Sequence, residues 1–280
     1  MQVVVITGIA QGMGREVAKL LAGPQTAVTG FDIDGAGIAS LRTWLEKEGC
    51  PHHLEVLDTT DRPGIIRFKD LVLAKFGRVD VVLSNVGIGF FGPFEEVDLE
   101  KALKCMEINV IGTAAVFQAF LPGMRDNRRG TLVAVSSLVG QVPFPFESIY
   151  SASKFAVEGL VLSLRYEVEP FGVKVALIQP AQVSTSFAAK IHTLPPEGSP
   201  YRERVARFIR KDEELIKSAP TPTQAAAEIV KVMKSENPRL FNQLDLKSTV
   251  FLLLNRFLPT SIRDSILLGQ MDIRPLEKGA

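Results

Sequence analysis

A short apolar run passes directly into a glycine-rich turn near the start of this chain, Val3-Val4-Val5-Ile6-Thr7-Gly8-Ile9-Ala10-Gln11-Gly12-Met13-Gly14. The β-branched residues predict a buried strand over 3–7, and the amphipathic segment behind the turn predicts a helix over 12–21. Such a turn lets the backbone approach a pyrophosphate, while the helix N-terminus supplies N–H donors and a favourable dipole. The stretch therefore predicts nucleotide binding, although its Gly-x-x-x-Gly-x-Gly spacing differs from Gly-x-Gly-x-x-Gly.

The same alternation of apolar runs and helix-length segments continues along the chain. Further strands are predicted at residues 26–31, 54–57, 79–83, 131–135 and 173–178, with helices at 36–47, from about 61, at 99–120 and at 149–170. Near-continuous apolar strands joined by helices are typical of a parallel sheet that is covered on both faces. We therefore expect a doubly wound, Rossmann-type α/β fold with its ligands at the carboxyl ends of the strands.

The pattern changes after Gln179. A Pro/Gly-rich piece at 194–200 precedes a highly charged helix at 201–217, and the capping box Thr221-Pro222-Thr223-Gln224 opens a helix to about 234. We expect a single domain over 1–280, with a core at 1–187, a substrate lid at 188–219 and C-terminal helices at 220–280. An apolar stripe along 246–268 fits docking on its own domain, and contact with a second subunit or a membrane surface stays open.

Composition narrows the classes of partner. The chain has 280 residues, of which 46% are hydrophobic and 22% charged, and its net charge of +1 gives no reason to expect a nucleic acid or an anionic membrane. The longest apolar run, 250–254, is far shorter than the roughly 18 residues of a membrane span. Cys50 and Cys105 lie in unrelated contexts, and no ligand cluster accompanies His52-His53. We expect a cytoplasmic protein without a metal site.

A Tyr-x-x-x-Lys pair, Tyr150 and Lys154, lies thirteen residues after Ser137. On a helix this spacing puts both side chains on one face. A lysine ammonium there lowers the pKa of a phenol from its ordinary value of about 10. A phenol tuned in this way can exchange a proton with an alcohol or carbonyl oxygen, so the pair predicts acid–base chemistry.

The second strand is predicted to end close to Asp32, eighteen residues beyond Gly14. A carboxylate at this position can accept hydrogen bonds from the ribose hydroxyls of NAD and would repel the 2′-phosphate of NADP. Gln11 and Ile33 add no positive charge, and Arg15 is one residue into a helix. These residues favour NAD, with NADP as the alternative if Asp32 only begins a turn.

Taken together, residues 7–14, Asn85-Val86-Gly87, Asn109, Ser137 and Tyr150/Lys154 resemble the short-chain dehydrogenase/reductase family in its shorter, non-extended form, over about residues 2–187. The resemblance implies that Tyr150 is the general acid/base and that Lys154 holds the nicotinamide ribose and lowers the tyrosine pKa. It also implies that Ser137 binds the substrate oxygen and that Asn109 fixes a water in a proton relay. The cofactor-binding residues that it implies are Gly8, Gln11, Gly12, Met13, Gly14, Asp32, Ile33, Asp58, Thr59, Asn85, Val86, Gly87, Tyr150, Lys154, Pro180, Val183 and Thr185.

The chain departs from the family pattern at three places. Ser84 and Val86 replace the first asparagine and the alanine of Asn-Asn-Ala-Gly, and Ala181 replaces the glycine of Pro-Gly. The last change requires position 181 to avoid a conformation that only glycine adopts easily. None of the three departures touches Asn109, Ser137, Tyr150 or Lys154.

Three segments are predicted to border the mouth of the site: 88–94, 142–146 and 186–219. Phenylalanine and proline dominate the first two, and no arginine cluster is present to clamp a carboxylate or phosphate. This favours a lipophilic alcohol or ketone, such as a steroid, a retinoid or a long-chain compound. The alternative is that these phenylalanines pack the lid or a subunit contact.

The expected function is an NAD(H)-dependent oxidoreductase that interconverts a secondary alcohol and a ketone. The alternatives are an NADP(H)-dependent carbonyl reductase and a non-catalytic regulatory protein that binds a dinucleotide. The short chain disfavours an epimerase or dehydratase of the extended branch. The resemblance further implies a homodimer or homotetramer formed through the two long helices, at 99–120 and 149–169.

Overall fold

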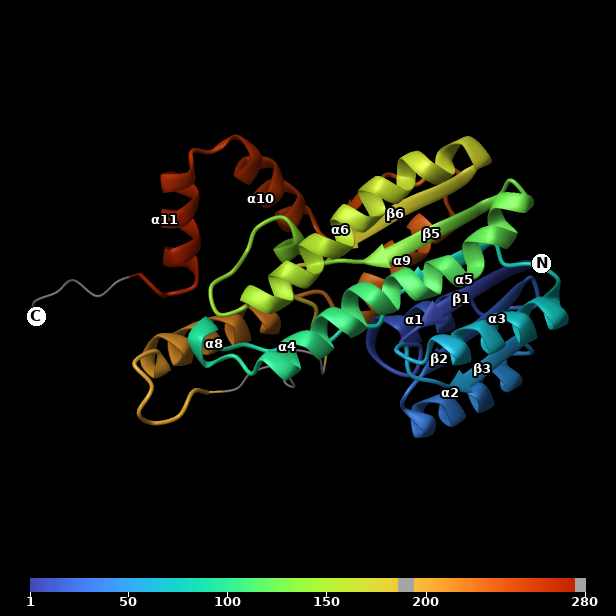
Figure 1. Ribbon diagram of the computed structural model, residues 1–280, viewed down its shortest axis with the longest axis horizontal. Coiled ribbons are helices and arrows are strands. Elements are labelled where there is room, and N and C mark those ends of the chain that lie inside the picture. Colours follow the sequence, from blue (N-terminus) through green and yellow to red (C-terminus); the bar gives the residue numbers. More distant parts are fainter. Residues whose placement is uncertain (186–193, 275–280) are drawn as a thin grey trace, which may run out of the picture.

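The computed structural model describes residues 1–185 and 194–274. Within them, parallel strands form one seven-stranded sheet in the order β3-β2-β1-β4-β5-β6-β7 (Figure 1). The strands are β1 (Gln2–Thr7), β2 (Thr26–Asp32), β3 (His52–Val56), β4 (Val81–Ser84), β5 (Gly130–Val135), β6 (Val173–Gln179) and β7 (Phe241–Gln243). The predicted doubly wound α/β fold is therefore confirmed.

The sheet separates two hydrophobic cores. Successive residues of β1 alternate between them: Val4 and Ile6 belong to one core, and Val3 and Val5 belong to the other. Helices α1 (Gly12–Leu21), α2 (Gly35–Lys47) and α9 (Pro222–Lys234) cover the first face, whereas α3 (Arg62–Phe76), α5 (Gly112–Asp126) and α6 (Ser148–Val168) cover the second. This two-sided cover explains why the strands are apolar along their whole length.

The strand order reverses at β1, and this reversal positions the site. Val4 of β1 pairs with Val28 of β2 on one side and with Val81 of β4 on the other. The connections leave these strands toward opposite faces, so a crevice opens at the carboxyl ends between β1 and β4. At the other end of β1, the Asp80 carboxylate accepts a hydrogen bond from the backbone N–H of Val3 at 2.8 Å.

The long helix predicted at 99–120 is interrupted. It consists of α4 (Leu99–Met106), a π turn η2 (Glu107–Ile111) and α5, which runs through Pro122 to Asp126. Because Pro122 lies near the end of α5, it removes only one late backbone hydrogen bond. Among the described residues, Leu99–Asp126 is long and apolar enough to cross a membrane. Eighteen residues within it have a mean hydropathy of 1.3, but half of these are buried inside the protein.

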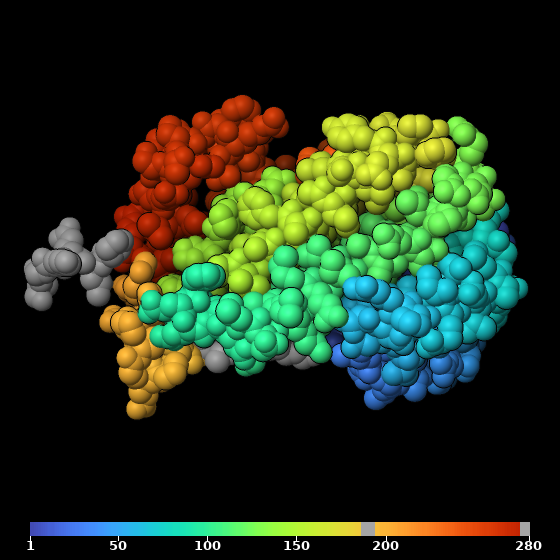
Figure 2. Space-filling view, viewed as in Figure 1, coloured from blue at the N-terminus to red at the C-terminus, as the bar shows by residue number. Residues whose placement is uncertain are grey.

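The structure differs from the sequence prediction at two places in the second half. The sequence pattern does not predict strand β7, since its three residues are too short to show a period. The apolar segment predicted along 246–268 is two helices, α10 (Leu246–Phe257) and α11 (Thr260–Gln270), because Pro259 separates them. Both helices form a protruding arm near α8 (Arg202–Lys217), at the end of the molecule away from the N-terminus (Figures 1 and 2).

The part of the chain that the structure describes also contains three single-turn 3-10 helices: η1 (Phe94–Glu96), η3 (Leu138–Gly140) and η4 (Glu169–Phe171). Residues 186–193 of the predicted lid lie outside the described residues. The described part of that segment contains α8, whose buried Phe208 contacts Phe91 and Phe146 edge-on at centroid distances of 5.4 and 5.7 Å. Helix α8 therefore packs on the two phenylalanine-rich loops that follow β4 and β5.

Candidate active site

A cavity of about 630 Å³ opens at the carboxyl ends of the strands. It brings together all of the site residues predicted from the sequence except Gly14 and Asn109, which lie behind its wall. The predicted residues that line it are Gly8, Gln11, Gly12, Met13, Asp32, Ile33, Asp58, Thr59, Asn85, Val86, Gly87, Ser137, Tyr150, Lys154, Pro180, Val183 and Thr185.

Two structural reasons favour glycine at the three glycine positions of the first turn. Gly8 and Gly12 adopt φ values of +68° and +54°, which favour glycine. A Cβ at Gly14 would lie 2.2 Å from the carbonyl oxygen of Gly8, so only glycine lets α1 approach the turn this closely. No side chain caps the N-terminus of α1. These features fit the pyrophosphate of a dinucleotide, which the N–H groups and dipole at that terminus would bind.

Asn85 fixes the end of β4 to this turn. Its side-chain amide donates to the carbonyl oxygens of Thr7 and Gly8, both at 3.2 Å. The Thr7 hydroxyl oxygen in turn accepts the backbone N–H of Asn85 at 3.1 Å. The neighbouring departure from the family pattern is accommodated, because the Ser84 hydroxyl hydrogen-bonds with that of Thr113 at 3.0 Å.

Asp32 lies at the end of β2 and is almost fully buried, with its carboxylate against the wall of the cavity. Its two oxygens accept the backbone N–H groups of Ala10 and Asp34, each at 3.0 Å. A carboxylate has about four acceptor positions, so this one retains capacity for ribose hydroxyls.

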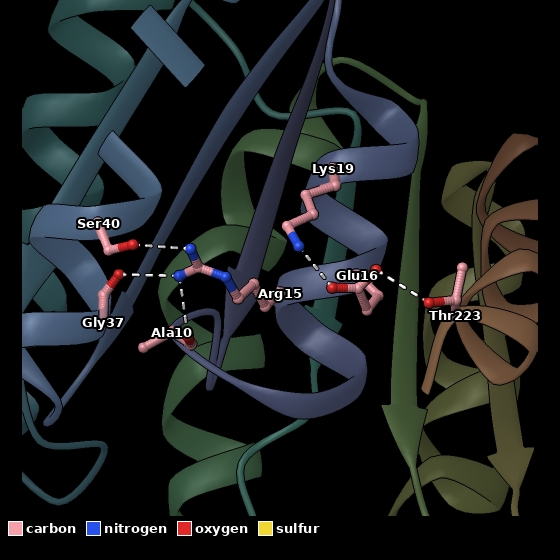
Figure 3. Close-up of polar contacts among 7 residues, drawn as sticks. All are labelled: Ala10, Arg15, Glu16, Lys19, Gly37, Ser40 and Thr223. Carbon is pink, nitrogen blue, oxygen red and sulfur yellow. Dashed lines mark hydrogen bonds and ion pairs between the residues drawn. The ribbon is translucent and has the colours of Figure 1, made fainter. Parts of the chain in front are cut away.

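Arg15 does not line the cavity, although it is close in sequence. Its guanidinium donates to the carbonyl oxygens of Ala10 and Gly37 and to the Ser40 hydroxyl, at 2.9 to 3.2 Å (Figure 3). Arg15 thus ties the glycine-rich turn to the start of α2. Its guanidinium is already engaged by these three acceptors.

The other face of α1 is tied to α9. Glu16 forms an ion pair with Lys19 at 2.8 Å and accepts a hydrogen bond from the Thr223 hydroxyl at 3.1 Å (Figure 3). These contacts hold the pKa of Glu16 below its ordinary value, with the hydrogen bond from Lys19 as the largest cause. The first helix is therefore fixed on both sides.

Asp58 and Thr59 lie beyond β3, on the side of the cavity where the resemblance places adenine. The Asp58 carboxylate accepts the backbone N–H and the hydroxyl of Thr60 at 2.8 and 2.9 Å, which shapes the turn. Thr59 packs against Gly112 so closely that a Cβ there would lie 2.9 Å from its side chain. These contacts anchor this wall to the start of α5.

Tyr150 and Lys154 project from the first turns of α6, one turn apart as predicted. The Lys154 ammonium lies 5.6 Å from the centroid of the Tyr150 ring and donates to the carbonyl oxygen of Val135 at 2.9 Å. Burial lowers the pKa of Lys154 to about 8. Ser137 starts the loop after β5, and its hydroxyl is hydrogen-bonded to the Tyr150 phenol.

The pKa of Tyr150 is raised, which corrects the expectation that the lysine lowers it. Burial is the largest cause, the negative charge of Glu147 adds to it, and the hydrogen bond from Ser137 opposes both. The phenol is therefore protonated at neutral pH. This is the form required to donate a proton to a carbonyl oxygen.

Asn109 lies in the π turn η2 and holds the loop that follows β4. Its amide donates to the Ile88 carbonyl oxygen at 2.8 Å and to the Ser153 hydroxyl at 2.9 Å, and it accepts the Ile88 N–H at 2.8 Å. A Cβ at Gly87 would lie 3.3 Å from the Lys154 ammonium and 3.5 Å from the Asn109 oxygen, so the three residues are adjacent. Its proposed role in a water relay stays a prediction.

The remaining wall is largely apolar. Ile88, Phe91 and Phe144 come from the two loops that were predicted to border the site, and Ile216 comes from α8. Phe146 adopts φ +65°, which is unusual for a bulky residue and marks a strained loop. Ala181 has no such conformation, so its replacement of the family glycine causes no strain. Phenylalanines here therefore line the cavity and also pack α8, as both interpretations of the sequence required.

Sequence reasoning missed two acidic residues in this wall, Glu147 and Asp212. Each is 5% exposed and lines the cavity. Burial and the charge of Asp212 raise the pKa of Glu147 well above its ordinary value. The sequence did contain a sign that Asp212 is unusual. Asp212 falls at helical spacing from Val205 and Phe208, on the buried face of α8, where an apolar residue is expected.

Comparison with known proteins identifies the chain's relatives. A family model described as short chain dehydrogenase matches residues 2–194. The chain is 31% identical over 239 residues to the 3-ketodihydrosphingosine reductase of Bacteroides thetaiotaomicron, with 85% of each protein covered. It is 32% identical over 272 residues to the 17-beta-hydroxysteroid dehydrogenase type 1 of Mus musculus, with 92% of this chain and 75% of the relative covered.

Two solved structures have the same fold. A short chain dehydrogenase/reductase from Burkholderia phymatum in complex with NAD superposes with a TM-score of 0.80 at 24% identity, over 99% of this chain and 98% of that one. An alcohol dehydrogenase from Thermococcus sibiricus complexed with 5-hydroxy-NADP gives 0.71 at 24% identity, over 87% and 94%. Proteins with this architecture thus hold either dinucleotide.

Proposed function

Because the chain belongs to the short-chain dehydrogenase family, we propose that it interconverts a secondary alcohol and a ketone, with NAD(H) as its cofactor. One observation carries the proposal: Ser137, Tyr150 and Lys154 share a cavity with the glycine-rich turn and Asp32. A dinucleotide-binding regulatory protein would not need a buried proton donor beside its ligand.

The preference for NAD rests on charge. Asp32 presents a carboxylate to the part of the cavity that would hold the adenosine ribose, and a 2′-phosphate there would meet electrostatic repulsion. The nearby cation, Arg15, is held by Ala10, Gly37 and Ser40. An NADP(H)-dependent enzyme would need a cation at this place.

The residues of the chain would handle the proton and the developing charge, whereas the nicotinamide ring supplies or accepts the hydride. In the direction of reduction, the protonated Tyr150 donates its phenolic proton to the carbonyl oxygen. Ser137 donates a hydrogen bond to the same oxygen as negative charge develops on it. Lys154, whose pKa is lowered to about 8, can stabilise the tyrosinate that remains and favour its reprotonation.

The apolar wall of the cavity favours a lipophilic substrate. Ile88, Phe91, Phe144 and Ile216 supply hydrophobic contacts for a hydrocarbon skeleton. The names of two relatives specify a hydroxysteroid and a ketodihydrosphingosine. Both names support a ketone or alcohol carried on a large apolar framework.

The first experiment is a titration of the purified protein with NADH and, separately, with NADPH, followed by nicotinamide fluorescence. We expect tighter binding of NADH and then turnover of at least one compound in a panel of steroid and long-chain ketones. Tighter binding of NADPH would overturn the assigned role of Asp32. Saturable binding without turnover across the panel would favour the regulatory alternative.

A further inference from the structure

The substrate end of the cavity contains two carboxyl groups that the proposed reaction does not use. Glu147 immediately precedes α6, three residues before Tyr150, and Asp212 is on α8. Both line the cavity and both are 95% removed from solvent. They are close enough for the charge of Asp212 to raise the pKa of Glu147 and for Glu147 to raise that of Tyr150.

Glu147 has no hydrogen-bond donor among the described residues, whereas the other buried carboxyl groups nearby have theirs. Glu147 stands at the N-cap position of α6, yet its side chain does not cap the helix. Asp212 accepts a hydrogen bond from the Gln182 amide at 3.2 Å. Glu158, also on α6, accepts from Ser136, Gln141 and Gln179. A buried carboxyl group without a partner is costly, and a donor on the ligand would remove that cost.

The cations of the cavity do not neutralise Glu147. Lys104 and Lys154 line the same cavity, but Lys154 donates to the Val135 carbonyl oxygen, and neither lysine contributes to the shifted pKa of Glu147. Burial and Asp212 alone account for that shift. Glu147 therefore lies beside a second acidic residue, and no cation among the described residues forms an ion pair with it.

We propose that Glu147, with Asp212 beside it, binds a protonated amine of the substrate close to the carbon that exchanges hydride. The inference rests on the proposed oxidoreductase function and narrows its substrate to a lipophilic amino ketone or amino alcohol. An ammonium group offers up to three donors and a full positive charge, so it can serve both carboxyl groups. A neutral hydroxyl offers one donor and no positive charge.

The amine and the reacting oxygen must be near neighbours in such a substrate. Glu147, at the N-cap position of α6, and Tyr150, three residues later, line the same cavity, and the charge of Glu147 reaches the Tyr150 phenol and raises its pKa. A group held by Glu147 therefore lies a few bonds from the oxygen held by Tyr150. The rest of the molecule would occupy the apolar wall formed by Phe91, Phe144 and Ile216.

The test is calorimetric titration of the full chain, in the presence of NADH, with octylamine and with octan-1-ol. These probes share an alkyl chain, and the amine is protonated at pH 7 because its pKa is close to that of lysine, about 10.4. We expect octylamine to bind about tenfold or more tightly than octan-1-ol, as a charge-assisted hydrogen bond predicts. In Glu147→Gln the ratio of the two affinities should fall close to one, and in Asp212→Asn it should decrease.

Glu167→Gln is the matched control, because Glu167 is an exposed residue of the same helix, remote from the cavity. It should keep the wild-type ratio. Equal affinities in the wild type, or an unchanged ratio in Glu147→Gln, would overturn the proposal. If Glu147→Gln does not fold, the proposal is tested by measuring the affinity of the wild type for octylamine as a function of pH. This affinity should rise with pH as Glu147 ionises. The other titratable groups that line the same cavity are Asp32, Asp58, Lys104, Tyr150, Lys154 and Asp212.

Turnover separates this inference from the proposed function. Activity on neutral ketones combined with equal binding of the two probes would reject the amine site and leave the oxidoreductase assignment intact. Preferential octylamine binding without turnover of any ketone or alcohol would reject the assignment and leave the amine site intact.

Discussion

Substitution of Tyr150 should lower the rate of the chemical step without changing cofactor binding. Because Tyr150→Phe deletes only the phenolic oxygen, we expect kcat to fall by about 10²- to 10⁴-fold, the usual contribution of a positioned acid. The affinity for NADH should stay within about twofold, since the ring that remains fills the same space. Steady-state kinetics measure the change in kcat, and fluorescence titration measures the affinity for NADH. Near-full activity of this variant would show that Tyr150 is not the proton donor.

Asp32 is predicted to set cofactor preference through its charge. Asp32→Asn keeps an acceptor oxygen for the Ala10 or Asp34 N–H group but removes the repulsion toward a 2′-phosphate. We expect the ratio of NADPH to NADH affinity to rise by roughly tenfold, measured by fluorescence titration. Asp34→Asn serves as the control, because Asp34 caps α2 through the Gly37 N–H and does not line the cavity. A shift of equal size in that control would show that the effect is not specific to position 32.

Individual site residues could be predicted wherever a local pattern carries them. The glycine-rich turn, Asp32 and the Tyr150/Lys154 pair follow from spacing along one strand or one helix. Glu147 and Asp212 could not be paired in advance, because they meet only when α8 folds back over the loop before α6. The predicted direction of the pKa shift of Tyr150 was wrong for a related reason: burial, which depends on segments distant in the sequence, is the largest cause of the shift.

At the scale of single elements, the contact between α1 and β1 is the tightest part of the cofactor site. Gly14→Ala would place a Cβ 2.2 Å from the Gly8 carbonyl oxygen, so α1 must move away from the turn. We expect a loss of at least about 2 kcal/mol of stability, as for overpacking, and loss of measurable NADH binding. Chemical denaturation and fluorescence titration measure these effects.

Gly23→Ala is the matched control for this helix. Gly23 lies just beyond α1 and does not have a positive φ, and a Cβ added to it would meet no atom within 4 Å. The substitution should change stability by less than about 0.5 kcal/mol, as is usual for surface positions. Equal losses in the two variants would contradict the steric account.

Elements were predictable where burial imposes one period on many residues. The strands from β1 to β6 and the helices between them satisfy that condition, because each packs on a core on at least one face. Strand β7 has only three residues and is too short to show a period. The apolar stripe along 246–268 continues across Pro259, so it does not mark the break between α10 and α11. The π turn at Glu107–Ile111 has no sequence signature, since it depends on how Asn109 meets Ile88 and Ser153.

For the whole molecule, Glu147 makes stability depend on pH. Its pKa is raised in the folded state, so the folded protein keeps a proton that the unfolded chain loses above about pH 4.5. The stability of the wild type therefore falls, relative to Glu147→Gln, as pH rises from there toward the folded pKa. The slope is about 1.4 kcal/mol per pH unit.

Thermal unfolding of the two proteins from about pH 4.5 to about pH 8 measures this difference. The gap in Tm should widen in favour of Glu147→Gln as pH increases. Glu167→Gln, whose carboxylate faces solvent in both states, should show a flat difference. A gap that narrows with pH would mean that Glu147 is ionised and stabilised in the folded protein.

The outer faces of α4 and α6 carry apolar side chains in water. Leu103 is 65% exposed and Phe155 is 44% exposed. We propose that a second copy of the chain covers these helices, as the family resemblance implies. Phe155→Glu should then shift the mass measured by light scattering from an oligomer toward a monomer. Glu167→Gln should leave the mass unchanged, and a wild-type monomer would refute the proposal.

The central place of β1 also has a consequence for biosynthesis. β1 is synthesised before the other strands of this sheet, yet the Asp80 side chain that accepts a hydrogen bond from the Val3 N–H lies 77 residues later, next to β4. At roughly 5–20 residues per second, about 4 to 15 seconds pass between the synthesis of these two segments. Throughout that interval the nascent chain can pair β1 with β2, but the other edge of β1 exposes its unpaired backbone N–H and C=O groups to the cell. β1, which lies in the interior of the finished sheet, is thus the part of the growing polypeptide that most needs a chaperone to protect it.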